Sequence, residues 1–490
     1  MVDFYAPLSI DELSDTVANE PELDTITPDA TWKTLLANHI QQFNAQYANV
    51  LYHGRQVIMR FIPTYERRKH QVHYDFIAQQ SFENLYQNTR IKIGEVSKNK
   101  AVIDVTKTHA VAWLKDGRCR TYRRGVVFNP MPINAKPLPD SYYNLWQGFA
   151  VEPKKGDCTM ILNHIRNVIC NGDIEVYDYL IKWIAAKIQR PDKPSGAAVV
   201  LRGKKGSGKG TLGHFLMHLW GEHGLHISSS KHLTGQFNSH LEACCFLFAD
   251  EAFFHGDKAG ESTLKALITE PTMLIERKGF DAIQCSNYLQ ILMATNEKWA
   301  VPATADERRY CVLDVSDSMI GNRDYFGRLH AAMEQESVIA AFLHDMLHLD
   351  LTGWHSGDIP ETDALKEQRL YSLDSIGRWL VDSVQNGHFS GCKFAENGYV
   401  WTGWPEFRTM TPKQLQASYA SWCSENKISP YDIQGHVQLG KELAIIFKRT
   451  RGSAGKVYHV GTNSEARQRL CEHYNINLSE PVEGIENPYQ

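Results

Sequence analysis

The stretch RGKKGSGKGTL (residues 202–212) constrains the fold of this chain more strongly than any other part of the sequence. It follows an apolar run, AAVVL, and precedes LGHFLMHLW, in which apolar residues recur at helical spacing. A glycine-rich turn between a strand and a helix allows backbone N–H groups to converge on phosphate oxygens. Residues 196–316 then alternate apolar runs with helical patterns, which is typical of an α/β fold with a parallel sheet. The sequence therefore predicts a phosphate-binding loop on such a sheet.

Within the loop, the glycines permit tight turns, and Lys209 supplies a positive charge to the β- and γ-phosphates of ATP. Gly210 stands where such loops usually carry Ser or Thr, and a hydroxyl follows one residue later, at Thr211. The form GKGT is also frequent in nucleotide kinases, so the loop alone does not decide the class of enzyme. The predicted nucleotide-binding residues are Gly203, Gly206, Ser207, Gly208, Lys209, Gly210 and Thr211.

Two further apolar runs end in polar residues. CCFLFADE ends in Asp250 and Glu251, and YLQILMATN ends in Asn296. Ligands of open α/β sheets lie at the carboxyl ends of the strands. We therefore expect Asp250 and Thr211 to hold Mg²⁺, and Glu251 to polarise the attacking water. Asn296 is expected to contact the γ-phosphate or that water.

The segment ADERRYCVLDV places Arg308 and Arg309 directly before another predicted strand. An arginine in this position can stabilise transition-state charge at the ATP of a neighbouring subunit. A pair of solvated arginines explains the same pattern.

Between the two polar strand ends, STLKALITEPTMLIERKGFDAIQC predicts a helix over residues 262–269 and a β-hairpin. Its strands are predicted at residues 273–277 and 280–285, around a turn at residues 278–279. A hairpin tip that carries a cation, Lys278, and an aromatic ring, Phe280, suits contact with a nucleic-acid backbone or a stacked base.

Five segments of this chain, in the order in which they occur, closely resemble the motifs of superfamily three helicases. They are the phosphate loop, the acidic pair, LKALITEP…IERKG, MATN and ERR. These are compact AAA+ ring motors of viruses, phages and plasmids. NLWQGFAVEP, GQFNSHL and NEKWAVPA are similar to the phage-type branch, which is associated with primase or polymerase modules. The resemblance covers residues 144–351. The resemblance implies an ATP-dependent DNA helicase that moves 3′→5′ as a hexameric ring. It also implies that Lys265 and Lys278 contact DNA. Arg308 or Arg309 would be the arginine finger, and Arg309 is the weakly preferred candidate.

Charge is distributed unevenly in the N-terminal part. Residues 1–32 contain eight acidic residues and no Lys or Arg, whereas residues 53–124 contain 15 Lys and Arg against six Asp and Glu. This surplus suggests a surface for a polyanion, although a solvated basic face fits equally well. Primases of this family carry an Asp-x-Asp pair on a strand, and we find no such pair in residues 1–150, so primase activity is not expected.

The C-terminal part shows the order helix, helix, β-hairpin, which is that of a winged helix, with Lys448, Arg449 and Arg451 as DNA contacts on its wing. The predicted parts are an acidic tail (1–31), a basic α+β domain (32–150), a helical collar segment (151–195), the AAA+ core (196–320), a helical subdomain (321–385), a linker (386–410) and the winged-helix-like domain (411–490).

Ten cysteines occur without a CxxC pair, which argues against a structural zinc site. No signal peptide and no apolar run of about 20 residues is visible, so we expect a soluble protein of the cytoplasm, that of a bacterial host if a phage encodes it. The expected cofactors are ATP and Mg²⁺. The expected partners are single-stranded and forked DNA, a primase and a polymerase. Two alternatives stay open: an initiator or loader without processive unwinding, and a nucleotide kinase, which leaves Asn296 and the hairpin without a role.

Overall fold

The computed structural model describes residues 31–63, 73–98, 100–251, 258–279, 281–305, 307–396, 399–401, 403–405, 408–452 and 455–478. These residues fall into two compact units. The smaller unit comprises residues up to 127 together with 138–144, and the larger unit comprises residues 128–137 and those from 145 onward. The predicted boundary near residue 150 is thus close to the end of the smaller unit, but residues 128–137 belong to the larger one.

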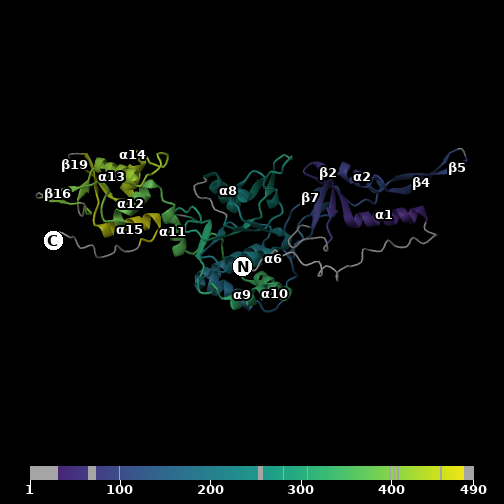
Figure 1. Ribbon diagram of the computed structural model, residues 1–490, viewed down its shortest axis with the longest axis horizontal. Helices are drawn as coiled ribbons and strands as arrows, with labels where there is room; N and C mark the ends of the chain where they lie inside the picture. Colours follow the sequence, from purple (N-terminus) through teal and green to yellow (C-terminus); the bar gives the residue numbers. More distant parts are fainter. Residues whose placement is uncertain are drawn as a thin grey trace. The chain divides into compact units, whose positions relative to one another are not determined.

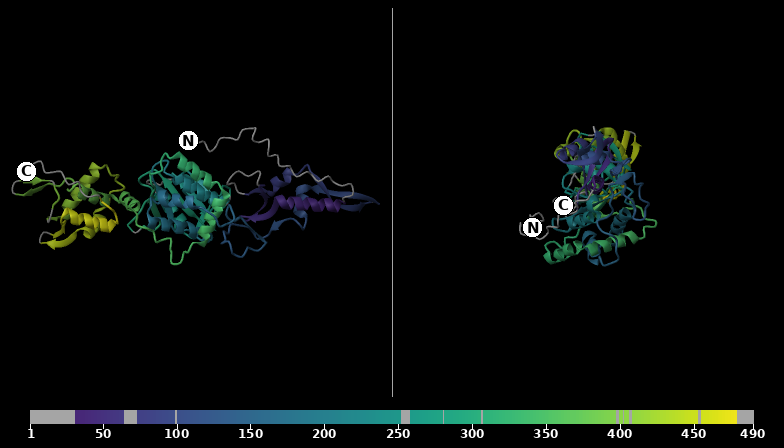
Figure 2. Two further views of the ribbon diagram at one scale, coloured as in Figure 1. Left: turned by 90° about the horizontal axis from the view of Figure 1, so that it is seen from below. Right: turned by 90° about the vertical axis from the view of Figure 1, so that its right-hand side faces the viewer.

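A five-stranded parallel sheet forms the centre of the larger unit and confirms the predicted α/β architecture (Figures 1 and 2). Its strands lie in the order β10-β11-β14-β9-β15. Their bounds are β9 (Ala198–Arg202), β10 (Gly224–Ile227), β11 (Phe246–Asp250), β14 (Gln290–Thr295) and β15 (Tyr310–Asp314). In the register, Thr295 of β14 and Asp314 of β15 both lie beside Arg202, the last residue of β9. The segments after these three strands therefore emerge together at one edge of the sheet.

Both faces of the sheet are buried. In β9, Val199 and Leu201 belong to one core, and Ala198 and Val200 belong to the other. The first core also takes in α5 (Ile174–Gln189), α6 (Lys209–Trp220), α9 (Arg323–Met333) and α10 (Glu336–His348), and the second takes in α8 (Lys258–Thr269) and α11 (Asp363–Tyr371). Burial on both faces explains why these strands read as continuous apolar runs.

The segment expected to be a separate helical collar shares the first core instead. It contains α4 (Thr159–His164), a π-helical turn (Ile165–Ile169) and α5. The helix α5 begins after Asp173, whose side chain accepts a hydrogen bond from the Val176 N–H at 3.0 Å. The Trp183 indole donates to the Ala197 carbonyl at 3.0 Å, and Gln290 donates to the Trp183 carbonyl at 2.8 Å. Helical periodicity identifies an apolar face but not the surface that covers it.

The predicted hairpin lies between β11 and β14 in the chain. Its strands are β12 (Thr272–Ile275) and β13 (Ile283–Ser286), shorter than predicted, because the last pair of the ladder is Ile275 with Ile283. Residues 278–279 form a turn, as predicted, and Gly279 has φ of +82°.

The C-terminal part has a core of its own. It contains α12 (Ser375–Gln385), α13 (Pro412–Glu425), α14 (His436–Ile446), α15 (Asn463–Tyr474) and a three-stranded sheet in the order β18 (Thr409–Met410), β20 (Gly455–His459), β19 (Lys448–Gly452). The expected linker contains the short pair β16 (Phe394–Glu396) and β17 (Tyr399–Trp401). α12, expected in the preceding helical subdomain, contributes Trp379 to this core. No helix in the part of the chain that the structure describes has the length and apolar character needed to cross a membrane.

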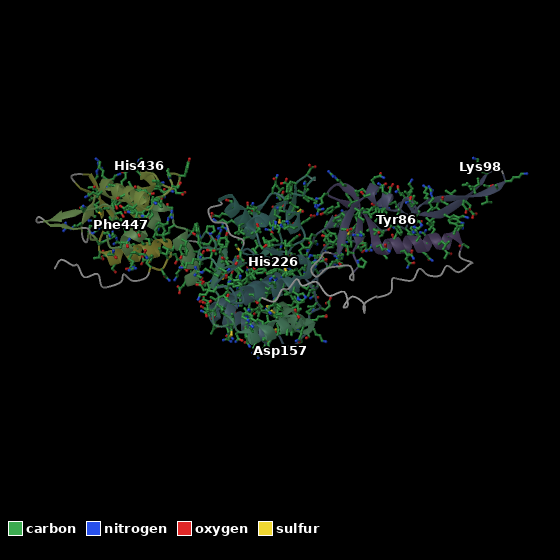
Figure 3. All side chains as sticks on the ribbon, viewed as in Figure 1. Tyr86, Lys98, Asp157, His226, His436 and Phe447 are labelled. Carbon is green, nitrogen blue, oxygen red and sulfur yellow. The ribbon has the colours of Figure 1, made fainter. Side chains whose placement is uncertain are left out.

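The smaller unit is α+β, as predicted. Its four-stranded sheet has the order β3 (Tyr74–Ala78), β2 (Arg55–Phe61), β1 (Tyr47–Tyr52), β6 (Thr121–Tyr122), and its helices are α1 (Trp32–Gln46), α2 (Gln79–Leu85) and α3 (His109–Lys115). A hairpin of β4 (Arg90–Lys98) and β5 (Ala101–Thr108) extends away from this sheet, with Lys98 at its tip (Figures 1 and 3). A parallel pair, β7 (Gly125–Val127) and β8 (Tyr142–Asn144), completes the unit.

Candidate active site

The predicted phosphate loop connects β9 to α6 at the carboxyl edge of the central sheet. Gly206 has φ of +81° and Gly208 has φ of +102°, values that side chains rarely allow. A Cβ on Gly208 would lie 2.7 Å from Cε1 of His164, so glycine is required here on two grounds. α6 begins at Lys209, and the first N–H groups of a helix have no partner within it. The loop therefore has the conformation and the donors of an anion cradle.

Lys209 is buried and points across the loop. Its Nζ donates to the carbonyls of Gly203 at 2.6 Å and Lys204 at 2.9 Å, and to Oδ1 of Asn296 at 3.1 Å. Burial lowers the pKa of Lys209, while the negative charges of Asp250, Glu251 and Asp317 oppose this shift. The cation is thus held beside three carboxylates, in a position to bridge phosphate oxygens and the sheet edge.

The acidic pair lies where the sequence placed it, at the end of β11. Asp250 is half-buried, and burial raises the pKa of its carboxyl; the negative charge of Glu251 adds to the shift and His226 opposes it. Glu251 has φ of +55°, which is unusual for a residue with a side chain. Its main-chain N–H donates to the Ala294 carbonyl of β14 at 2.9 Å, and its carboxylate accepts a short hydrogen bond from the amide of Asn296.

Oxygen donors suited to a divalent cation surround the loop. The Asp250 carboxylate and the Thr211 hydroxyl are hard ligands of the kind that Mg²⁺ prefers, so the residues present fit that ion. Thr211 lies in the first turn of α6, with its hydroxyl 3.4 Å from Nε2 of His330. Asp317, which pairs with Lys204 at 2.7 Å, adds a third carboxylate near the loop.

A buried histidine, His164, packs against the predicted phosphate loop at Gly208. His164, at the end of α4, is completely buried, and its Nδ1 lies 2.9 Å from the hydroxyl of Tyr325 in α9. Burial lowers the pKa of His164 to about 4. Neither His164 nor Asp317 was among the predicted site residues, because nothing in their local sequence signals the contact.

Arg308 and Arg309 lie at the amino end of β15, at the edge of the sheet opposite the loop. The main-chain N–H groups of both donate to Oε1 of the buried Glu307, at 3.0 Å and 2.7 Å. The guanidinium of Arg309 also lies 3.6 Å from that carboxylate, whereas Arg308 is exposed. Neither arginine reaches the phosphate loop of its own chain, because β15 runs parallel to β9 with Tyr310 beside Ala198.

The structure places the predicted DNA contacts of the larger unit in three different surroundings. Lys278 is exposed in the turn of the β12–β13 hairpin, and Phe280 lies outside the described residues. Lys265 pairs with Glu261 at 2.5 Å within α8 and lines a cavity of about 480 Å³ that Trp299 also lines. The wing residues Lys448, Arg449 and Arg451 are exposed on β19.

The sequence analysis did not predict a set of hydrogen bonds that fixes the hairpin to the loop before it. Asn238, in the loop after α7 (Ser230–Thr234), donates from its amide to the Leu274 carbonyl at 2.8 Å and accepts from the Glu276 N–H at 2.8 Å. Its own N–H donates to the Glu276 carbonyl at 3.2 Å. The preceding residue, Phe237, is 54% exposed. A large aromatic ring is thus presented next to the hairpin.

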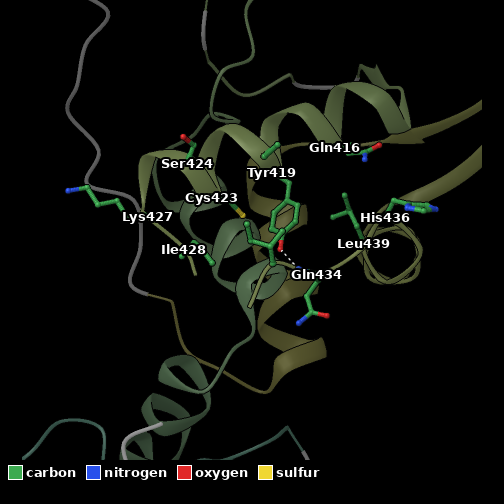
Figure 4. Close-up of a pocket in the computed structure, with 11 residues that line it drawn as sticks. Gln416, Tyr419, Cys423, Ser424, Lys427, Ile428, Gln434, His436 and Leu439 are labelled. Atoms are coloured by element: carbon green, nitrogen blue, oxygen red, sulfur yellow. Dashed lines mark hydrogen bonds between the residues drawn. The ribbon is translucent and has the colours of Figure 1, made fainter. Parts of the chain in front are cut away.

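A second cavity, of about 330 Å³, opens between α13 and α14 (Figure 4). Its lining mixes apolar side chains such as Leu439 and Ile428 with polar ones such as His436. The Tyr419 hydroxyl is occupied, since it accepts from the Gln434 N–H at 2.9 Å and lies 2.6 Å from Oγ of Ser375. All residues that line this cavity lie between Gln416 and Leu439, so it is separate from the predicted phosphate loop.

Residues 201–309 match the model of a family of unknown function (DUF5906). The chain is 26% identical over 182 residues to the DNA primase-polymerase of Nitratiruptor phage NrS-1, a match that covers 36% of this chain and 25% of that protein. The chain thus spans about a quarter of that relative's length. An apo structure of the NrS-1 C-terminal region matches with a TM-score of 0.56 at 16% identity, covering 88% of this chain and 98% of that one. An A-form apo structure of the same region gives 0.55 at 15% identity. These structures share the fold.

Proposed function

We propose that this chain is an ATP-driven DNA helicase that serves the replication of a phage or another mobile genetic element. The observation that carries the proposal is the chain of hydrogen bonds from Lys209 through Asn296 to Glu251, at the mouth of the phosphate loop. A cation for phosphates, an amide and a carboxylate on three neighbouring elements are the groups that ATP hydrolysis requires. The similarity to a phage primase-polymerase supports a role in phage DNA replication.

In this proposal each residue has a separate task. Lys209 and the loop N–H groups hold the phosphates, and Glu251 orients the attacking water. Bound Mg²⁺, held by Asp250 with Thr211, would neutralise charge on the β- and γ-phosphates. Asn296, which contacts both Lys209 and Glu251, senses whether the γ-phosphate is present.

The hairpin is the proposed DNA-gripping element. β13 ends at Ser286, and β14 begins at Gln290 and runs to Thr295, directly before Asn296. β14 therefore spans from the hairpin base to the nucleotide sensor, and a displacement at one end is carried along a fully buried strand. Lys278 at the hairpin tip would hold the DNA backbone, and Phe237 beside the hairpin would stack on a base.

The parallel sheet, its hairpin and the arginines at its far edge support an AAA+ motor of superfamily three, assembled head-to-tail as a hexamer. Arg308 is exposed and free to serve a neighbour's nucleotide, whereas Arg309 is engaged with Glu307. The helices α12 to α14 with the sheet β18-β20-β19 support a winged helix that grips duplex DNA through Lys448, Arg449 and Arg451.

Unwinding of a forked duplex, compared between the natural chain and Lys209→Ala, tests the proposal. We expect ATP-dependent strand separation that the substitution abolishes. DNA binding with slow hydrolysis and no strand separation would support an initiator or loader instead. Phosphorylation of a nucleoside monophosphate, unaffected by DNA, would support a nucleotide kinase.

A further inference from the structure

The segment that follows β14, residues 296–305, is held in place by side chains from distant parts of the chain. It begins at Asn296 and contains no helix or strand. Backbone groups in such a segment have no ladder or helix partner, so other groups must satisfy them. The Lys298 carbonyl, two residues from Asn296, accepts from Nη1 of Arg202 at 3.0 Å and from Nε2 of Gln368 at 2.7 Å.

Gln368, in α11, uses both ends of its amide on this segment. Its side chain is completely buried. Besides donating to Lys298, it accepts at Oε1 from the N–H groups of Ala300 at 2.6 Å and Val301 at 3.3 Å. The opposite orientation of the amide would direct its NH₂ group at two N–H donors, so the surroundings decide which end is oxygen. A buried amide that is satisfied on both sides favours one arrangement of the backbone around it.

The helix α11 is itself anchored to the central sheet and to the same segment. Thr362, which caps its first turn, donates from its hydroxyl to the Val312 carbonyl of β15 at 2.6 Å. The buried Arg369 donates to the Thr304 carbonyl at 3.1 Å and forms hydrogen bonds of 2.6 Å and 2.9 Å with the Glu361 carboxylate. The glutamine therefore projects from a helix whose position is fixed at both ends.

Arg202 links the same segment to the phosphate loop. It is the last residue of β9 and directly precedes Gly203. Its guanidinium forms hydrogen bonds of 2.7 Å and 2.8 Å with the Asp314 carboxylate and lies 2.5 Å from the carboxylate of Glu367 in α11. The Lys298 carbonyl thus accepts from the strand that leads into the loop and from α11.

We propose that Gln368 is a positioning residue for ATP hydrolysis. By holding residues 298–301, it fixes the place of Asn296 between the phosphate loop and the end of β11. Polar groups that are already oriented before the reaction lower its barrier, and a small misplacement of such a group slows turnover. Nucleotide affinity depends instead on Lys209 and the loop N–H groups, which Gln368 leaves in place. This inference rests on the proposed function and adds a residue that sets the rate of the same site.

Gln368→Met tests this role, because methionine has a similar length but no amide. We expect the kcat for ATP to fall about tenfold, while KM and the affinity for a fluorescent nucleotide change by no more than about threefold. Gln368→Glu keeps the shape and the acceptor but loses the donor to Lys298, so kcat should fall about threefold. This second variant serves the same test if Gln368→Met does not fold.

Ser372→Ala is the matched control. The Ser372 hydroxyl accepts from the Ala303 N–H at 3.0 Å, in the same segment but farther from Asn296. Like Gln368→Met, the control leaves a backbone N–H without its acceptor, so both variants should lower the melting temperature. Only the change at Gln368 should lower kcat, and Ser372→Ala should stay within about twofold of the natural chain.

Amide hydrogen exchange supplies a readout that does not depend on activity. In Gln368→Met the amides of Ala300 and Val301 should exchange about tenfold faster, whereas Ser372→Ala should accelerate exchange at Ala303. Unchanged exchange at residues 300–301 would overturn the inference, as would natural kcat despite faster exchange. An equal fall of kcat in Ser372→Ala, or a parallel loss of nucleotide affinity, would overturn it as well. Absence of ATP hydrolysis by the natural chain refutes the proposed function instead.

Discussion

Lys209 and Asn296 are joined by a hydrogen bond of 3.1 Å between Nζ and Oδ1, although 86 residues separate them in the chain. The same amide donates to Glu251, so the phosphate loop, the end of β14 and the end of β11 meet in one polar cluster. Because an amide has both a donor and an acceptor, Asn296 can contact the cation and the carboxylate at once. Asn296 therefore links the predicted phosphate loop to the ends of β11 and β14.

Replacing Asn296 with Ala should separate nucleotide binding from hydrolysis. Lys209 and the loop glycines remain, so the affinity for ATP should change by no more than about threefold. Loss of one preorganised donor at a reacting centre costs about 10²- to 10³-fold in turnover. Measurement of ATP turnover and of the affinity for a fluorescent nucleotide checks this. The exposed neighbour Glu297→Ala is the control, and a parallel loss of binding in Asn296→Ala would assign Asn296 to substrate binding instead.

Gly208→Ala should destabilise the larger unit around its central sheet, because the new Cβ meets the buried His164 ring and φ of +102° is strained for alanine. The two effects together predict a loss of about 2–4 kcal/mol in the free energy of unfolding. Gly210→Ala is a matched control: it lies in the same loop, in α6, with nothing within 4 Å of its Cβ position. Thermal and denaturant unfolding should show Gly210→Ala at or above the stability of the natural chain. Equal losses in both variants would contradict the role of His164.

The pH dependence of stability should report the buried His164. Burial lowers its pKa to about 4 from the ordinary 6.5, so between these values the unfolded chain binds the proton and the folded chain does not. Stability is therefore lost as the pH falls from 6.5 toward 4, by about 3 kcal/mol in total. Melting of the larger unit across this range should show a flatter profile in His164→Asn, whereas the exposed His348→Asn should keep the natural slope. Identical slopes in all three proteins would refute the assignment.

The central sheet could be predicted because both of its faces are buried, which leaves apolar runs such as residues 197–201 and 290–294 in the sequence. The acidic pair and Asn296 could be predicted because parallel strands end at one edge. In contrast, the prediction that α12 belongs to the helical subdomain of residues 321–385 is wrong. Its apolar stripe signals a buried face, but only the folded chain shows that Trp379 joins the C-terminal core.

The contacts that support the site are absent from local sequence patterns. His164 precedes Gly208 by 44 residues, and Asn238 precedes Glu276 by 38. Each contact depends on how helices and loops pack across the fold, and neither residue has a spacing that marks it. The residues predicted to perform chemistry follow strand ends and glycine turns, whereas the residues that contact and position them come from distant segments.

Asn238→Ala should weaken the coupling between ATP and DNA. The substitution removes the side-chain hydrogen bonds to Leu274 and Glu276 and leaves the hairpin less firmly placed. We expect basal ATP hydrolysis within about twofold of the natural chain, while DNA-stimulated hydrolysis and unwinding fall about tenfold, a coupling change of typical size. Asn238→Asp keeps the acceptor for Glu276 and should give an intermediate effect. An equal fall in basal and stimulated hydrolysis would instead indicate a general folding defect.

Arg308 should act on a neighbouring subunit's ATP, because β15 begins at the edge of the sheet opposite its own phosphate loop. Arg308→Ala and Lys209→Ala should each abolish hydrolysis alone. In a ring assembled from equal amounts of the two, about a quarter of the interfaces pair an intact loop with an intact arginine. Mixing the two inactive variants should therefore restore roughly a quarter of the natural ATP turnover.

The control for this experiment mixes Lys209→Ala with Glu251→Gln. Lys209 and Glu251 belong to the ATP site of the same subunit, where Asn296 forms hydrogen bonds with both. Every subunit in this mixture therefore has a defective ATP site of its own, whichever neighbour it contacts. No turnover should return in that mixture. If the mixture with Arg308→Ala also stays inactive, Arg308 does not work in trans. A corresponding recovery with Arg309→Ala would then assign the role to Arg309, once its ion pair with Glu307 is broken.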